Sequence, residues 1–187
     1  MNPLEKPIVN WFKKNKRDLP WRTATPWGVM VSEYMLQQTP VNRVLPKWIE
    51  WMERWPTPKD LAAATPAQVI TAWGRLGYPR RALRLHAAAQ IIAEDFNNEV
   101  PEDELTLQQL PGIGEYTAAA IAAFAFDQRS LVMDVNIRRV LTRVIHCIRR
   151  KNHERGWIGF LICKSTKSCV EEKTWNAALG NAYRLMY

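Results

Sequence analysis

The sequence predicts an all-α fold, and three observations support that prediction. The dipeptide Thr-Pro recurs at 25–26, 39–40, 57–58 and 65–66. This pair is typical of a helix start, because threonine is a good N-cap and proline is favoured at the first helical position. The segments between and after these pairs have the apolar pattern of helices, and no convincing alternating strand is found.

The individual helices are justified by local signals. The N-terminal segment is amphipathic, the four Thr-Pro pairs each begin one helix, and "RRALRLHAAAQIIAEDF" is a long helix with a basic start. Two short helices follow in "LTLQQL" and "EYTAAAIAAFAF", and Asp134 or Asn136 stands near the start of the last one, "NIRRVLTRVIHCIRR". We expect helices at about 3–15, 26–38, 40–54, 58–64, 66–73, 80–96, 105–110, 115–126 and 136–150.

Length and charge limit the class of protein. A chain of 187 residues suits one domain or a modest two-lobed one. The net charge of +8 indicates a polyanionic partner, most often nucleic acid. No apolar run reaches the length of a membrane span and the start is not a signal peptide, so we expect a cytoplasmic protein that does not contact membrane. The three cysteines (Cys147, Cys163 and Cys169) form no CxxC pair, and the scattered histidines predict no metal site.

Glu33 stands out in the helix expected at 26–38. The residues three and four positions away share its helical face, and only one of the four is polar: Val29, Met30, Leu36 and Gln37. Burying a carboxylate is costly and raises its pKa. Glu33 is therefore either a misplaced charge or a functional one.

The stretch "LPGIGEYTAAA", 110–120, predicts a hairpin between two helices. Gly112 and Gly114 allow a tight turn with positive φ and leave the backbone bare. Such a turn aims several N–H groups and the positive end of the next helix at one point, which suits a phosphate. The alternatives are a DNA-binding helix-hairpin-helix motif at about 105–126 and a structural turn between helices.

Asp134 follows the hairpin by twenty residues, in "VMDVNIRRVLTRV". An aspartate ahead of a helix is usually a cap. The order of hairpin, apolar helix, short loop and Asp opening a basic helix nevertheless resembles the helix-hairpin-helix–Gly/Pro–Asp superfamily of base-excision DNA glycosylases. That resemblance implies a two-lobed helical fold.

Four further stretches resemble the adenine DNA glycosylase (MutY) family, in order and nearly without gaps from Trp11 to Val144: "RDLPWR", "SEYMLQQTPV", "AWGRLGYPRRALRLHAAA" and "LPGIGEYTAAAIAAFAF". Relatives similar to endonuclease III have a small residue in place of Glu33 and a lysine nucleophile in place of Tyr116. Both differences imply a monofunctional enzyme that hydrolyses the N-glycosidic bond of adenine mispaired with 8-oxoguanine or guanine.

The resemblance implies catalytic roles for four residues. Glu33 would protonate adenine N7 and then activate water, as a carboxylic acid in an apolar setting is able to do. Asp134 would stay ionised and stabilise the oxocarbenium ion, so that two carboxylates divide the work. Tyr116 and Asn136 would assist at the sugar and at Asp134.

Other residues are expected to bind the duplex. Adenine must leave the helix before it is cleaved, and by family position Gln38 and Tyr78 wedge into the stack with Gln37 beside them. Trp21 and Arg22 would line the adenine pocket. The alternatives are Trp21 as core, Tyr78 as a cap after Gly77 and the glutamines as a polar helix end. The basic residues expected at phosphates are Arg80, Arg81, Arg84, Arg138, Arg139 and Arg143.

The sequence also departs from that family. A [4Fe–4S] cluster is expected from the family, but the four-cysteine ligand run is absent, so we expect no cluster in this chain. Residues 147–187 match poorly, and the domain that checks for 8-oxoguanine is absent. We therefore expect residues 1–187 to form a glycosylase core that ends early and acts on double-stranded DNA as a monomer. The alternatives are a thymine-mismatch glycosylase and a non-catalytic DNA-binding remnant.

Overall fold

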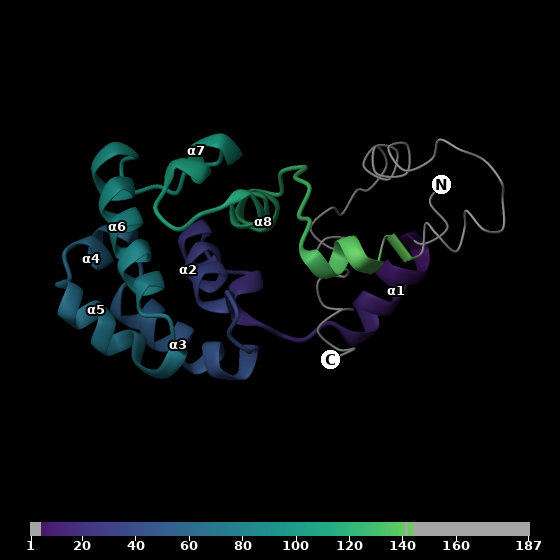
Figure 1. The fold of residues 1–187 in the computed structure, drawn as a ribbon, viewed down its shortest axis with the longest axis horizontal. Coiled ribbons are helices and arrows are strands. Elements are labelled where there is room, and N and C mark those ends of the chain that lie inside the picture. The colour runs from purple at the N-terminus through teal and green to yellow at the C-terminus, as the bar shows by residue number, and fades with distance from the viewer. Residues whose placement is uncertain (1–4, 141, 144–187) are drawn as a thin grey trace. The chain divides into compact units, whose positions relative to one another are not determined.

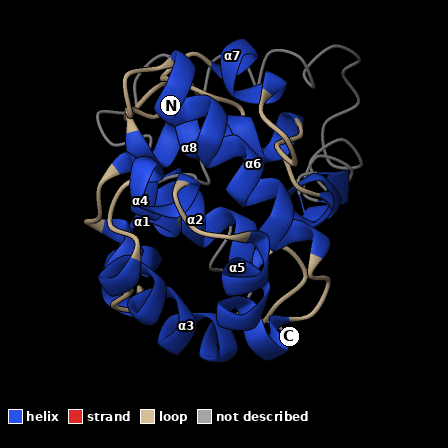
Figure 2. Cartoon of the chain, turned by 90° about the vertical axis from the view of Figure 1, so that its left-hand side faces the viewer, coloured by secondary structure: helices blue, strands red, loops and turns tan. Residues whose placement is uncertain are grey.

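Every regular element in the described part of the chain is a helix (Figures 1 and 2), which confirms the all-α prediction. The computed structural model describes residues 5–140 and 142–143. The α-helices between residues 5 and 126 are α1 Glu5–Asn15, α2 Pro26–Leu36, α3 Val41–Arg54, α4 Pro58–Ala62, α5 Pro66–Trp73, α6 Arg80–Asp95, α7 Glu104–Gln109 and α8 Glu115–Ala125. Two 3₁₀ turns, η1 Pro20–Arg22 and η2 Gly74–Leu76, were not predicted.

The chain divides into two compact units. One unit is Asp18–Phe126 and contains η1, η2 and α2 to α8. The other combines Met1–Arg17 with Asp127–Tyr187, and its described part contains α1 and helical residues 135–140 and 142–143. The helix predicted at 136–150 therefore begins as expected, and its later residues lie outside the described ranges. No helix within those ranges is long and apolar enough to cross a membrane.

Threonine caps begin three of the four helices that the Thr-Pro pairs predicted. Thr25 accepts a hydrogen bond from the backbone N–H of Gly28, and Thr57 and Thr65 form capping boxes with Asp60 and Gln68. Thr39 differs. Helix α3 begins after Pro40 without a side-chain cap, because the Thr39 hydroxyl lies buried and within 3.3 Å of the carbonyl oxygen of Leu76.

Tryptophans form the centre of the larger unit. The Trp51 ring lies edge-on to Trp55, at 4.9 Å between centroids, and to Trp73, at 5.4 Å. Trp27 Nε1 donates to the carbonyl of Trp55 at 3.1 Å, so this large aromatic side chain is buried with its polar atom satisfied. The cluster connects α2, α3 and α5 in one core.

Helix α2 runs through this core and packs against α3, α6 and α8. All of its residues are buried except Pro26 and Glu33. Alanines make up much of its partner α8, and small side chains let two helices approach closely. Figure 1 shows α8 beside α2, so the hairpin that precedes α8 is held directly by the buried helix.

Helix α2 ends at Leu36, two residues before the predicted end. Gln37 is its C-cap and Gln38 has a φ of 55°, in the left-handed region. The last carbonyls of the helix are taken by a side chain of α6, since Arg81 donates to Tyr34 and Met35 at 3.1 and 3.2 Å. This external partner replaces the further helical turn that the sequence pattern predicted.

The turn between α7 and α8 has the predicted hairpin form. Gly112 has a φ of +87°, and a Cβ there would lie 3.0 Å from atoms of Arg84 and Tyr34. Gly114 was also expected at positive φ, and this is wrong: it is the N-cap of α8, with φ −98°. A Cβ on Gly114 would meet nothing within 4 Å. Only Gly112 is therefore required by backbone conformation and by close packing.

We predict that Gly112→Ala destabilises the protein by about 1–3 kcal/mol, because it adds both a left-handed strain and a clash with Tyr34. The matched control is Gly114→Ala, in the same turn, for which we expect a change within about 0.5 kcal/mol. Urea denaturation followed by tryptophan fluorescence measures both. Equal losses for the two variants would contradict the assignment of the turn geometry to Gly112.

Candidate functional site

Glu33 lies where the buried helix α2 reaches the protein surface. Its side chain is half-buried, whereas Val29, Met30 and Leu36 on the same face are buried. Gln37, the polar neighbour, is half-buried as well. The apolar helical neighbours of Glu33 are therefore buried, while Glu33 itself is partly accessible to solvent.

Two loops beside the end of α2 carry Gln38 and Tyr78. Both residues have positive φ values, 55° and 50°, although neither is glycine. Both are exposed, and the Tyr78 side chain keeps 66% of its surface in water. Left-handed backbone is unfavourable for such residues and persists only where the surroundings enforce it. The strain coincides with the residues that the family resemblance assigned to DNA.

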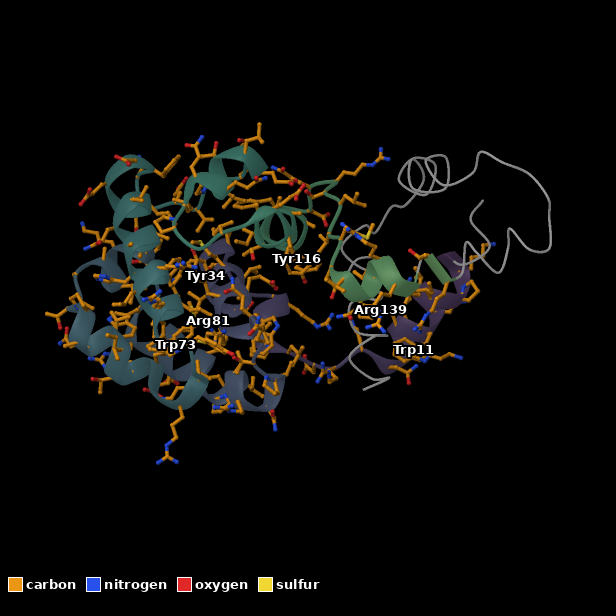
Figure 3. The ribbon with its side chains drawn as sticks, in the orientation of Figure 1. Trp11, Tyr34, Trp73, Arg81, Tyr116 and Arg139 are labelled. Atoms are coloured by element: carbon orange, nitrogen blue, oxygen red, sulfur yellow. The ribbon has the colours of Figure 1, made fainter. Side chains whose placement is uncertain are left out.

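Arg81 connects these two loops. Its Nη1 donates to the carbonyls of Tyr34, Met35 and Gln37 at the end of α2. Its Nη2 donates to Thr39 Oγ1 at 2.9 Å and to the carbonyls of Leu76 and Gly77 at 3.2 and 3.0 Å. Figure 3 shows Arg81 between Tyr34 and Trp73 inside the unit. The prediction that Arg81 contacts phosphate is wrong, because its guanidinium is buried and used by the backbone.

The Arg81 cation is balanced by dipoles. The carbonyls at a helix C-terminus carry partial negative charge, and three of the six acceptors lie there. The Trp73 ring adds a cation–π contact, at 5.2 Å from Cζ to the ring centroid. Burial lowers the pKa of Arg81 from its ordinary value. The guanidinium geometry lets one charge satisfy several carbonyls in fixed directions.

The hairpin is attached to α2 through Tyr34, the residue after Glu33. The buried Tyr34 hydroxyl donates to the carbonyl of Pro111 at 2.5 Å. Burial raises the pKa of Tyr34, so the phenol stays protonated and able to donate. Gly114 is exposed at the start of α8, and Tyr116 lies in the first turn of that helix with 40% of its surface exposed. Because Tyr34 follows Glu33 in α2, this hydrogen bond fixes the position of the hairpin relative to Glu33.

Trp21 and Arg22 form η1 at the entrance to α2. Trp21 is buried in the core and meets Trp48 edge-on, with 5.8 Å between ring centroids. This placement supports the alternative that Trp21 is a core residue. Arg22 is half-buried. A role for either residue in an adenine pocket stays a prediction.

Asp134 lies in the second unit, where it begins the helix at 135–140. Its Oδ1 accepts from the backbone N–H groups of Asn136 at 3.0 Å and Ile137 at 2.6 Å. Its Oδ2 accepts from Asn136 Nδ2 at 3.1 Å. The cap that the sequence analysis treated as the alternative is therefore real, and the Asn136 side chain bonds the same carboxylate; a catalytic role for either residue stays a prediction. Arg138 is exposed one turn later.

The expected site residues fall into both units. Those of the first unit are Trp21, Arg22, Glu33, Gln37, Gln38, Tyr78, Gly112, Gly114 and Tyr116. Asp134, Asn136 and Arg138 belong to the second unit. The structure brings Glu33, the two strained loops and the hairpin together around the end of α2. It likewise brings Asp134 and Asn136 together at one helix start.

The described residues contain no group of three or more His, Cys, Asp or Glu that could hold a metal ion. All three cysteines lie outside the described ranges. Three cysteines are one short of the four thiolates that hold a [4Fe–4S] cluster. The residues present do not fit that group, and no chemical step is assigned to it. His86 is buried and bonds the carbonyl of Ala64 at 2.9 Å, which is a structural role.

Sequence reasoning missed two residues that organise the site. Tyr34 looked like one more apolar position of α2, and Arg81 looked like one of several surface arginines. No local signal distinguishes Arg81 from Arg80. The bonds of both Tyr34 and Arg81 join segments more than forty residues apart along the chain, and such pairing is not visible in one sequence.

Comparison with known proteins identifies the family of this chain. The HhH-GPD superfamily base excision DNA repair protein family matches residues 31–155. An adenine DNA glycosylase of Mycolicibacterium smegmatis is 53% identical over 148 residues, which are 78% of this chain and 50% of that protein. The human adenine DNA glycosylase is 44% identical over 147 residues, 73% of this chain and 27% of that protein. The chain thus spans half or less of the length of these relatives.

Solved structures share the fold at low sequence identity. A thermostable thymine-DNA glycosylase has a TM-score of 0.79 at 20% identity, over 95% of this chain and 83% of that one. Endonuclease III in a non-covalent DNA complex has a TM-score of 0.73 at 19% identity, over 93% of this chain and 79% of that one. Since the family match covers more than half of its residues, the chain belongs to the HhH-GPD superfamily of base excision DNA repair proteins.

Proposed function

We propose that this chain is the catalytic core of a monofunctional adenine DNA glycosylase, which hydrolyses the N-glycosidic bond of adenine mispaired with 8-oxoguanine or guanine. The observation that carries the proposal is Glu33, a carboxyl group at the surface end of an otherwise buried helix. The relatives named adenine DNA glycosylase, at 53% and 44% identity, support the choice of base.

Glu33 acts first as a general acid. Breaking a purine glycosidic bond requires a proton on the leaving base, and a carboxylic acid among apolar side chains is suited to hold one near neutral pH. Val29, Met30 and Leu36 provide that setting. Glu33 donates to adenine N7, and the resulting carboxylate then accepts a proton from the attacking water. Glu33 thereby regains from water the proton that it gave to adenine.

Asp134 acts as the stabilising carboxylate. The departing adenine leaves a cationic sugar, and a preoriented negative charge stabilises that cation. The three N–H donors on Asp134 fix its direction. Its role as a cap supports this function, because a carboxylate oriented by the backbone needs no rearrangement during the reaction. Asn136 positions Asp134, and Tyr116 assists at the sugar.

The duplex is opened and held by the remaining residues. Gln38 and Tyr78 enter the base stack, with Gln37 beside them, and fill the gap that the flipped adenine leaves. The hairpin at Gly112 and Gly114 presents backbone N–H groups to a phosphate, and Arg138 adds a charge contact. Trp21 and Arg22 line the adenine pocket. The net charge of +8 supports a duplex DNA partner, as do solved relatives described as DNA complexes.

Two other functions remain as alternatives. A thymine-mismatch glycosylase shares the fold, as the thymine-DNA glycosylase structure indicates, but thymine has no N7 for Glu33 to protonate. A non-catalytic remnant would bind duplex through the hairpin and release no base. Residues 1–187 would act as a monomer in either case.

The direct test is single-turnover release of adenine from a duplex that carries adenine opposite 8-oxoguanine. A duplex with adenine opposite thymine is the control, and one with thymine opposite guanine tests the thymine alternative. We expect release only from the 8-oxoguanine pair and, more slowly, from adenine opposite guanine. Binding of the lesion duplex without release of any base would contradict the proposed function and favour the remnant.

Substitution of Glu33 tests the general acid. Glu33→Gln keeps the size and hydrogen-bonding capacity of the side chain and removes its proton donor at N7. We expect adenine release to slow by roughly 10²–10⁴-fold, while duplex affinity and melting temperature stay near the wild-type values. Single-turnover kinetics and a filter-binding titration measure the two effects. An unchanged rate would remove Glu33 from the mechanism.

Asp134→Asn separates catalysis from capping. Asparagine caps helices about as well as aspartate, so we expect the free energy of unfolding to change by less than about 0.5 kcal/mol. Loss of the negative charge should nonetheless slow adenine release by roughly 10²–10³-fold. The matched variant Asp134→Ala should lose both the rate and about 1 kcal/mol of stability. Full turnover in Asp134→Asn would leave Asp134 as a cap alone.

A further inference from the structure

The two strained loops share a single support. Gln38 and Tyr78 are forty residues apart in sequence, and each has a left-handed backbone that a side chain rarely adopts. The carbonyl of Gln37, which precedes Gln38, and the carbonyl of Gly77, which precedes Tyr78, both accept hydrogen bonds from the guanidinium of Arg81. One buried cation thus fixes the peptide unit immediately before each exposed side chain.

Other contacts hold the loops only in part. Trp73 Nε1 donates to the carbonyl of Gly77 at 2.9 Å, which secures the Tyr78 loop to α5. The Thr39 hydroxyl lies 3.3 Å from the carbonyls of Gln37 and Leu76, and it accepts from Arg81 Nη2 at 2.9 Å. Arg81 therefore binds both loops directly and also orients the Thr39 hydroxyl between them.

The Arg81 side chain also lies against one of the two exposed residues. Its Cζ is 5.6 Å from the ring centroid of Tyr78 and 5.2 Å from that of Trp73. The exposed Tyr78 ring thus contacts the buried cation, which favours one orientation of the ring. Lysine would not reproduce this arrangement, because its ammonium group is a single point with three donors and the guanidinium is a planar fork.

From this geometry we infer that Arg81 is a positioning residue: it joins the Gln38 and Tyr78 loops so that the two side chains enter the base stack as one preformed wedge. The inference rests on the proposed function for the wedge itself. Arg81 contacts neither the adenine nor a phosphate. Its effect is on the step that separates the stacked bases, before any bond to the sugar breaks.

The test variant is Arg81→Lys in the 187-residue chain, and the matched control is Arg54→Lys. Arg54 also stacks on a tryptophan, with Cζ 4.6 Å from the Trp55 ring, but it is exposed at the end of α3. Both changes keep the charge. Only the Arg81 change removes the connection between the loops, so Arg54→Lys should behave as the wild type.

Unstacking of the bases is measured separately from the release of adenine. A duplex with 2-aminopurine next to the 8-oxoguanine becomes more fluorescent when the neighbouring base is unstacked. We expect Arg81→Lys to lose most of this rise while duplex affinity falls less than about threefold, because phosphate contacts dominate binding. Adenine release should slow on the order of tenfold from the paired duplex. Release should be nearly unaffected for an adenine that lies opposite 8-oxoguanine but is already unstacked by mismatched pairs on both sides.

The outcomes distinguish this role from a purely structural one. Equal slowing on the stacked and the already unstacked adenine opposite 8-oxoguanine, or an unchanged fluorescence rise, would overturn the positioning role. Wild-type protein that unstacks the duplex without releasing adenine would overturn the proposed excision and leave the wedge intact. If Arg81→Lys does not fold, Thr39→Val removes the hydroxyl bonded to Arg81 and must give the same selective loss. Equal slowing in that variant would also overturn the inference.

Discussion

The guanidinium of Arg81 is the interaction on which the rest of the proposed site depends. It ends α2 at Leu36, holds the residues that follow in a left-handed turn, and connects them to the segment before α6. Burying a cation costs free energy unless it is hydrogen-bonded. Here six oxygen acceptors and a tryptophan ring offset that cost. The same bonds connect two surface loops to the end of α2.

Helix α2 unites the functions proposed for this unit. Its last turn presents Glu33, the next residue Tyr34 secures the hairpin, and its C-terminal carbonyls accept hydrogen bonds from Arg81. Every residue of α2 except Pro26 and Glu33 is buried, so close packing leaves the helix little freedom to shift. The proposed acid, the proposed phosphate-binding turn and the proposed wedge are therefore all attached to one buried helix, and packing sets the spacing between them.

The sequence predicted the helices better than the long-range hydrogen bonds that hold the loops between them. The Thr-Pro pairs predicted four helix starts correctly because such signals are local, but Thr39 does not cap its helix, since its hydroxyl bonds residues about forty positions away. Gly112 was predicted correctly and Gly114 was not, because a GxG turn does not show which glycine takes the left-handed conformation. Arg81 was wrongly predicted to contact phosphate, because the local sequence does not show that distant carbonyls bind its guanidinium in the interior. Local rules cannot reach such contacts.

Asp134 shows why a structural explanation need not compete with a catalytic one. The sequence posed cap and catalyst as alternatives, but the hydrogen bonds that make Asp134 a cap also fix its carboxylate. A group that stabilises a short-lived cation is most effective when it is oriented in advance, so that no reorganisation is needed in the transition state. Capping supplies that orientation from the backbone. The role proposed for Arg81 follows the same principle: its hydrogen bonds, which stabilise the fold, also hold the two loops proposed to enter the DNA.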